Sequence, residues 1–272
     1  MREARKRPDS ESDGLGDWRI QAASRLVQAV PPAFVGGPSH AAGAPVHLTT
    51  ATEDARKRPI GFVTPSSAAL ALHMAYRSSE RARHQHATLK FIEVLTPRGK
   101  GYSVAFGDVE PLYDYFEECI GAFIFSFQAL EAFSNYEIAQ NLKGKFELKR
   151  GKDTKSVTPR ELERIASTEE KLASVLPTIL SLPSPKGRTV WGAFANLKRT
   201  RDASVHLKSN DQYPNRIPGG EEHDSLFRQF LISDDIAYFV RAAINMMCYF
   251  YPTERRTPRW LRAAQELCPE PS

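Results

Sequence analysis

The sequence predicts a mainly α protein, in which a bundle of four or five helices follows an N-terminal extension with room for one helix and a small β-hairpin. From residue 108 onward, apolar residues recur every three or four positions, the period of a helix with a buried face. Residues 1–60 are instead rich in Pro, Gly, Ala and Ser. Apolar residues make up 41% and charged residues 25% of the chain, which is ordinary for a globular protein.

The part of the chain before residue 108 is expected to form two segments. Residues 1–60 read as a disordered basic arm, with a short helix at residues 18–30. In residues 61–107, a helix begins near the sequence Thr64-Pro65, because proline suits the first turn of a helix. A hairpin is expected across the turn "TPRGKG", since apolar residues alternate after it, at Tyr102, Val104 and Phe106.

Residues 108–252 are expected to form the helical bundle. The first long helix is apolar nearly all round, which is typical of a central helix. After a basic, exposed run at residues 143–155, a second helix begins at "TPRE", where Thr158 and Glu161 form a capping box. A third helix covers about residues 187–208 and a last one begins near residue 233. Residues 253–272 are expected to be a basic tail.

Charge and cysteine content narrow the functional classes. The net charge of +5 and pI of about 9.1 are compatible with nucleic-acid binding without establishing it. The three cysteines are far apart, so neither a disulfide framework nor a zinc site is indicated, and no cofactor site is expected. No secretory signal is visible and the longest apolar run is too short to cross a bilayer, so we expect a cytoplasmic protein that does not bind membranes.

The third helix places Arg201 on its apolar side. At about 100° per residue, Val190, Phe194, Leu197 and Val205 form one stripe, and Arg201 lies within it. Burying an unpaired charge costs at least several kcal/mol. Arg201 therefore either pairs with a buried carboxylate, such as Glu131, or faces a cleft that binds anions, which an interface between two subunits could form.

His206 and Asp202 extend this candidate site. His206 lies about 140° round the helix from Arg201 and about 7.5 Å further along its axis. Asp202, four residues before His206, shares its face and could orient the imidazole. Lys198, Arg199 and Lys208 are candidate contacts for RNA phosphates, although such a charge run is usually a solvated face.

The segment from Arg201 to His206 resembles the R-x(4–6)-H motif of HEPN domains, including the polar residue that follows the arginine. The sequence "FSFQALEAFSN" is similar to the opening helix of many HEPN proteins, with Glu131 and Asn135 at familiar, supporting positions. The resemblance covers about residues 108–252. Decoys of similar spacing occur within residues 77–86 and from Arg199 to His206, so spacing alone decides nothing. The neighbour of Arg81 is not polar, so we interpret "RARHQH" as a solvated basic patch that could contact an RNA backbone.

The resemblance implies a homodimeric, metal-independent endoribonuclease that cleaves single-stranded RNA and leaves a cyclic phosphate. Arg201 would hold the phosphate, His206 would act as acid or base, and Asp202 would position His206. It also implies a toxin or defence role controlled by an antitoxin or other regulatory protein. Two alternatives stay open: a non-catalytic HEPN-like module that binds RNA, nucleotide or a protein, and a structural helical dimer whose arginine is merely paired.

Overall fold

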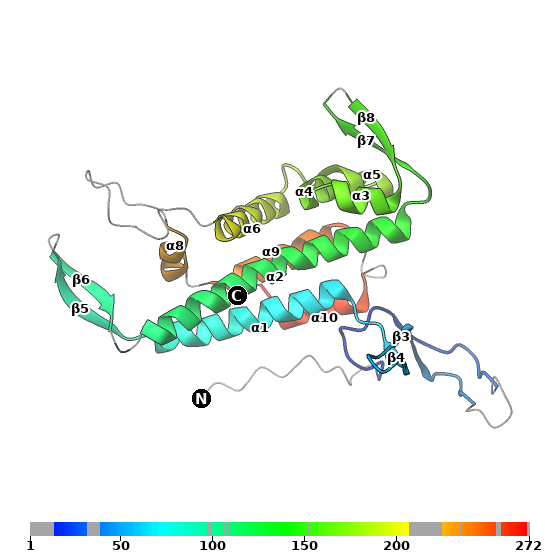
Figure 1. Cartoon of the computed structure of the whole chain (residues 1–272), viewed down its shortest axis with the longest axis horizontal. Coiled ribbons are helices and arrows are strands. Elements are labelled where there is room, and N and C mark those ends of the chain that lie inside the picture. The colour runs from blue at the N-terminus through cyan, green and yellow to red at the C-terminus, as the bar shows by residue number, and fades with distance from the viewer. Residues whose placement is uncertain are drawn as a thin grey trace.

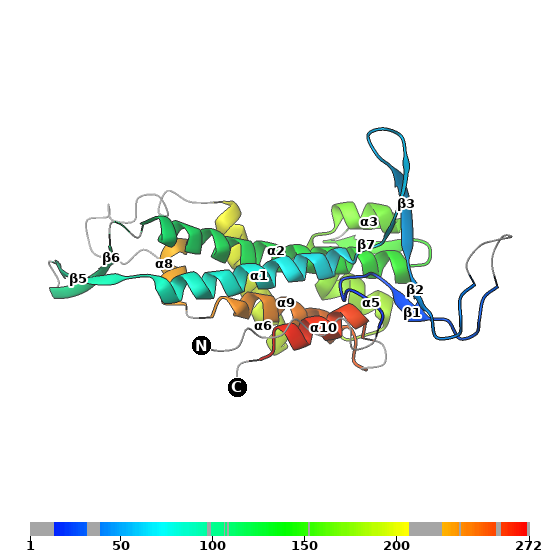
Figure 2. The same ribbon diagram turned by 90° about the horizontal axis from the view of Figure 1, so that it is seen from below.

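Two long antiparallel helices form the centre of the protein. The computed structural model describes residues 14–31, 39–96, 99–105, 107, 109–151, 153–206, 225–233, 235–253 and 257–270. Helices α1 (Ser67–Thr88) and α2 (Val109–Asn141) lie side by side along the long axis of the molecule (Figures 1 and 2). Five alanines of α1 are buried, and a Cβ added to Gly121 of α2 would lie 2.8 Å from Ser78 Oγ. Small side chains therefore allow the two backbones to approach closely.

Further helices complete the core. Helices α6 (Thr189–Val205) and α9 (Ala237–Tyr249) pack against α2, and α10 (Arg259–Leu267) packs against α1 and α9. The short helix α8 (Leu226–Ile232) adds Phe230, which is buried beside Phe123. The core thus includes α1 and also α10, which lies in the segment expected to be a basic tail.

The second predicted helix begins where the sequence indicates. Thr158 caps α3 (Pro159–Ile165) and forms the expected capping box with Glu161. The helix then ends after about two turns, because Ser167 and Glu170 form a second capping box that starts a new helical segment. That segment runs through α4 (Thr168–Glu170), the π-helical turn η2 (Lys171–Val175) and α5 (Leu176–Leu180).

Within the described residues, eight strands pair into four separate two-stranded antiparallel sheets. The prediction of a four- to five-helix bundle is therefore wrong: the described residues are 55% helical and 18% strand. The expected hairpin after α1 is confirmed, but the expected helix at residues 18–30 is replaced by a strand. The pairs are β1–β2 (Ala23–Arg25, Pro45–His47), β3–β4 (Thr49–Glu53, Pro59–Val63), β5–β6 (Phe91–Thr96, Gly99–Val104) and β7–β8 (Phe146–Arg150, Asp153–Val157).

The hairpin β7–β8 occupies the run that was expected to be only basic and exposed. The segment is rich in lysine, but its side chains alternate as in a strand: Leu148 and Val157 are buried while their neighbours face solvent. Gly151 adopts a positive φ of 61° at the tip of the hairpin, a conformation that glycine adopts without strain. The two hairpins β5–β6 and β7–β8 project from opposite ends of the helical body (Figure 1).

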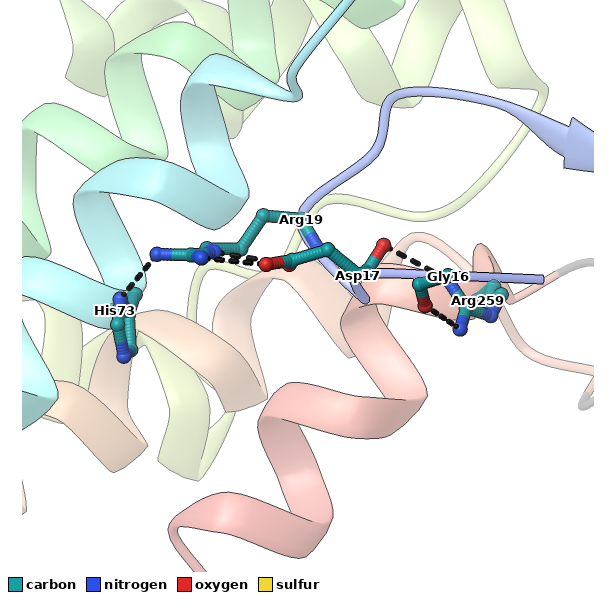
Figure 3. Close-up of polar contacts among 5 residues, drawn as sticks. All are labelled: Gly16, Asp17, Arg19, His73 and Arg259. Carbon is teal, nitrogen blue, oxygen red and sulfur yellow. Dashed lines mark hydrogen bonds and ion pairs between the residues drawn. The ribbon is translucent and has the colours of Figure 1, made fainter. Parts of the chain in front are cut away.

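A strap formed by residues 16–21 fastens the N-terminal sheets to the helices (Figure 3). Trp18 is 7% exposed and packs in the core, where its ring meets His73 of α1 edge-on. Arg259 donates hydrogen bonds to the carbonyl oxygens of Gly16 and Asp17. Arg19 is held by the carboxylate of Asp17 and lies 2.9 Å from His73 Nδ1. The strap therefore joins α1 to α10.

Candidate functional site

An open groove of about 540 Å³ runs along one face of α6. Trp191, Ala195, Lys198, Asp202 and His206 line it at steps of three or four residues, so they share one side of the helix. The groove therefore follows α6 over about 22 Å. Its remaining lining residues are Glu169, Phe194, Arg199 and Ala203.

The side of α6 next to the groove fixes the helix on α2. Phe194 and Leu197 are fully buried, and the ring of Phe194 stacks on that of Phe127, with 6.3 Å between the centroids and 17° between the planes. This confirms the start of the predicted apolar stripe. The far end of the stripe is not buried, because Val205 is 55% exposed.

Arg201 packs against α2 and does not line the groove. Its guanidinium carbon lies 3.8 Å from the centre of the Phe127 ring, and its Nη1 lies 2.9 Å from Asp202 Oδ1. The expected partner Glu131 is exposed, and Asp202 supplies the carboxylate instead. Arg201 is thus stabilised by an aromatic face and a neighbouring charge.

Asp202 links two of the predicted cations. Besides Arg201, its carboxylate contacts Lys198, with 3.1 Å between Asp202 Oδ2 and Lys198 Nζ. Glu169 lies 3.6 Å from the same ammonium. The hydrogen bond to Asp202 is the main cause of the raised pKa of Lys198. Asp202 meets His206 through its backbone, because its carbonyl oxygen accepts the His206 N–H at 3.1 Å.

His206 ends α6 as its C-cap and is exposed at one end of the groove. Arg199 is also exposed, and its Nη2 donates to Asn196 Oδ1 at 2.7 Å. The structure therefore brings His206, Lys198, Arg199 and Asp202 to one groove. Arg201 does not line this groove and lies against α2 instead. Lys208, the other predicted phosphate contact, lies outside the described residues.

The two supporting residues of α2 belong to a separate polar cluster. Asn135 Oδ1 accepts a hydrogen bond of 2.7 Å from Lys171 Nζ, which also donates to the Glu163 carbonyl oxygen at 2.8 Å. Burial lowers the pKa of Lys171, and the negative charge of Glu131 opposes that shift. Neither Glu131 nor Asn135 lines the groove, so their contacts support the packing of η2 on α2.

Sequence reasoning missed two features. Trp191 lies four residues before Ala195 and seven before Lys198, a spacing that could have placed it on the groove face. The second feature is a buried carboxyl, Glu137, which accepts hydrogen bonds from Tyr251 Oη at 2.5 Å and from Asn141 Nδ2 at 3.0 Å. Tyr251 comes from the far end of the chain, so no local pattern indicated that contact.

The described part of the chain contains no group of three or more His, Cys, Asp or Glu side chains arranged to hold a metal ion. None of its helices is both long and apolar enough to span a membrane. Comparison with protein-family models, with curated proteins and with solved structures finds no match for this chain.

Proposed function

We propose that the protein is a metal-independent endoribonuclease that binds RNA in the groove along α6. The observation that carries the proposal is the position of His206 in the same groove as Lys198 and Arg199. Two cations can bind phosphates of the RNA backbone, and histidine is suited to proton transfer near neutral pH. The HEPN resemblance of residues 201–206 supports the same chemistry.

In the proposed reaction, the 2′-oxygen of a ribose bonds to the adjacent phosphorus while the bond from phosphorus to the 5′-oxygen breaks. His206 accepts the proton of the 2′-hydroxyl, and the departing 5′-oxygen takes a proton from water. The products end in a 2′,3′-cyclic phosphate and a 5′-hydroxyl.

Arg201 would stabilise the charge that develops on the phosphate. For this, the guanidinium of Arg201 must leave the carboxylate of Asp202 and bind the RNA phosphate, or must reach the groove of a second protomer. We propose a homodimer for this reason.

A non-catalytic RNA-binding module is the second candidate. It is favoured by the engagement of Arg201 with Phe127 and Asp202, which keeps the guanidinium out of the groove. In that case Lys198 and Arg199 would bind RNA and no bond would break.

Cleavage of a labelled single-stranded RNA in EDTA tests the proposal. We expect the wild-type protein to cut it, and both His206→Ala and Arg201→Ala to lose cutting while keeping their circular dichroism spectra. His84→Ala serves as the control, because His84 is an exposed histidine on α1, far along the chain from the groove. RNA that is bound but intact in the wild type would select the non-catalytic candidate; no binding at all would exclude both.

A toxin or defence role, with an antitoxin or other regulatory protein acting in the cytoplasm, would follow from cleavage of cellular RNA. Expression of the wild-type chain is then expected to slow cell growth, and His206→Ala to relieve the effect. Equal growth with both proteins would count against this role.

A further inference from the structure

The groove combines an aromatic ring with basic side chains along a single helix. Trp191 is half-buried, and its ring rests on the buried Phe194, with 5.0 Å between the centroids. Ala195 follows one turn later and is exposed, so no bulky side chain of α6 covers the groove between Trp191 and Lys198. A flat ring on a rigid support thus lines an open channel.

Basic side chains stand at the start of α6 and along the groove. Lys186 Nζ lies over the face of the Trp191 ring, 5.5 Å from its centre, and Arg188 is exposed at the start of α6. In the groove itself, the two cations Lys198 and Arg199 stand beside two carboxylates, those of Glu169 and Asp202. Lys186 and Arg188 therefore add the positive charge that favours a chain of phosphates, and the exposed Lys186 side chain moves aside when a base stacks on the ring.

We infer that Trp191 is a stacking platform for an unpaired RNA base, and that it makes the groove selective for unpaired segments of RNA. The inference rests on the proposed function, since it assigns a specificity-determining residue to the same groove. Every base has a flat π-face, whereas a duplex encloses its bases and offers mainly its backbone. Stacking on Trp191 would place the neighbouring phosphates beside Lys198 and Arg199.

Tryptophan fluorescence gives a direct test, because Trp18 and Trp260 are 7% and 3% exposed and only Trp191 lines the groove. The probe is a single-stranded oligoadenylate with 2′-O-methyl groups, which lacks the free 2′-hydroxyl and stays intact. We expect it to quench the wild-type emission. An abasic oligonucleotide of equal length and a matched duplex should quench far less.

Substitutions of Trp191 test whether its ring binds the base. Trp191→Ala should weaken binding of the probe about tenfold or more, whereas Trp191→Phe, which keeps a ring, should retain most of the affinity and lose the quenching. Gly192→Ala is the matched control, because a Cβ at Gly192 meets no atom within 4 Å and the residue does not line the groove. Circular dichroism of each variant establishes that α6 is intact.

The outcomes are independent of cleavage. If the probe quenches the wild-type protein and the wild-type protein does not cut RNA, the result would support the stacking platform and overturn the proposed ribonuclease. Unchanged affinity of a folded Trp191→Ala variant, or equal quenching by the abasic oligonucleotide, would overturn the platform. Cleavage that depends on His206 could still stand in that case.

Discussion

Arg201 stacks on Phe127, a residue of another helix, with 3.8 Å between the guanidinium carbon and the centre of the ring. A double-mutant cycle measures this contact. We expect Arg201→Ala to lower the free energy of unfolding by about 1 kcal/mol, and its effect to be coupled to Phe127→Leu by a similar amount. Urea unfolding of the four proteins provides the measurement.

Arg199 supplies the matched control for that cycle. It lies two residues from Arg201, is exposed, and contacts Asn196 of its own helix. Arg199→Ala should therefore show almost no coupling to Phe127→Leu. Equal coupling for both arginines would mean that the ring contact contributes nothing specific to stability.

Glu137 predicts a pH dependence of stability. Burial raises the pKa of this carboxyl above its usual 4.5, despite hydrogen bonds from Tyr251 and Asn141. The folded protein thus holds a proton that the unfolded chain has lost, so stability falls as pH rises from about 4.5 through the raised pKa. Relative to Glu137→Gln, the wild type should lose about 1.4 kcal/mol for each unit by which that pKa is raised.

Urea unfolding from pH 4 to pH 8 compares the wild type with Glu137→Gln. Tyr251→Phe sharpens the comparison, because it removes the hydrogen bond that stabilises the ionised carboxylate and should make the loss larger and extend it to higher pH. Parallel stability profiles for the wild type and Glu137→Gln would show that Glu137 titrates alike in the folded and unfolded chains.

The strap has the opposite pH dependence. The hydrogen bonds from Arg19 hold the pKa of Asp17 at about 2, below its usual 3.8. The resulting stability is present above pH 4 and is lost as pH falls towards 2. Because the Asp17 side chain is 46% exposed, we expect only about 1 kcal/mol, measured as the difference between wild type and Asp17→Asn at pH 5. That difference should shrink at pH 2.5; a constant difference would contradict the assignment.

The buried ammonium of Lys171 gives a further prediction. Asn135→Ala removes one of its two hydrogen-bond acceptors and should lower the free energy of unfolding by about 1–3 kcal/mol. Gln140→Ala, at an exposed position of the same helix, serves as the comparison. RNA bound in the groove should raise the unfolding temperature of Asn135→Ala by as much as that of the wild type, since Asn135 lies outside the groove. Loss of RNA binding by a stable Asn135→Ala protein would place Asn135 in the site.

The features that the sequence predicted correctly were short-range, although some short-range features were missed. The capping box of Thr158 and Glu161 involves residues three apart, and the β5–β6 hairpin joins neighbouring segments, so local chemistry sufficed for both. The second capping box, at Ser167 and Glu170, has the same local signal, and it divides a helix that the apolar period alone had made continuous. The β7–β8 hairpin was missed because its lysines made the whole segment look exposed. Only burial in the folded protein distinguishes Leu148 from its neighbours.

The sequence by itself determined that a helix with an apolar stripe lies within about residues 187–208, and that an arginine, an aspartate and a histidine stand near its end. Only the tertiary structure decided which way they face. Arg201 packs on Phe127 of α2, whereas Trp191, Lys198 and His206 line the open groove. The reason is physical: helical period fixes angles around one axis, but the surroundings of each side chain depend on segments that are distant in sequence.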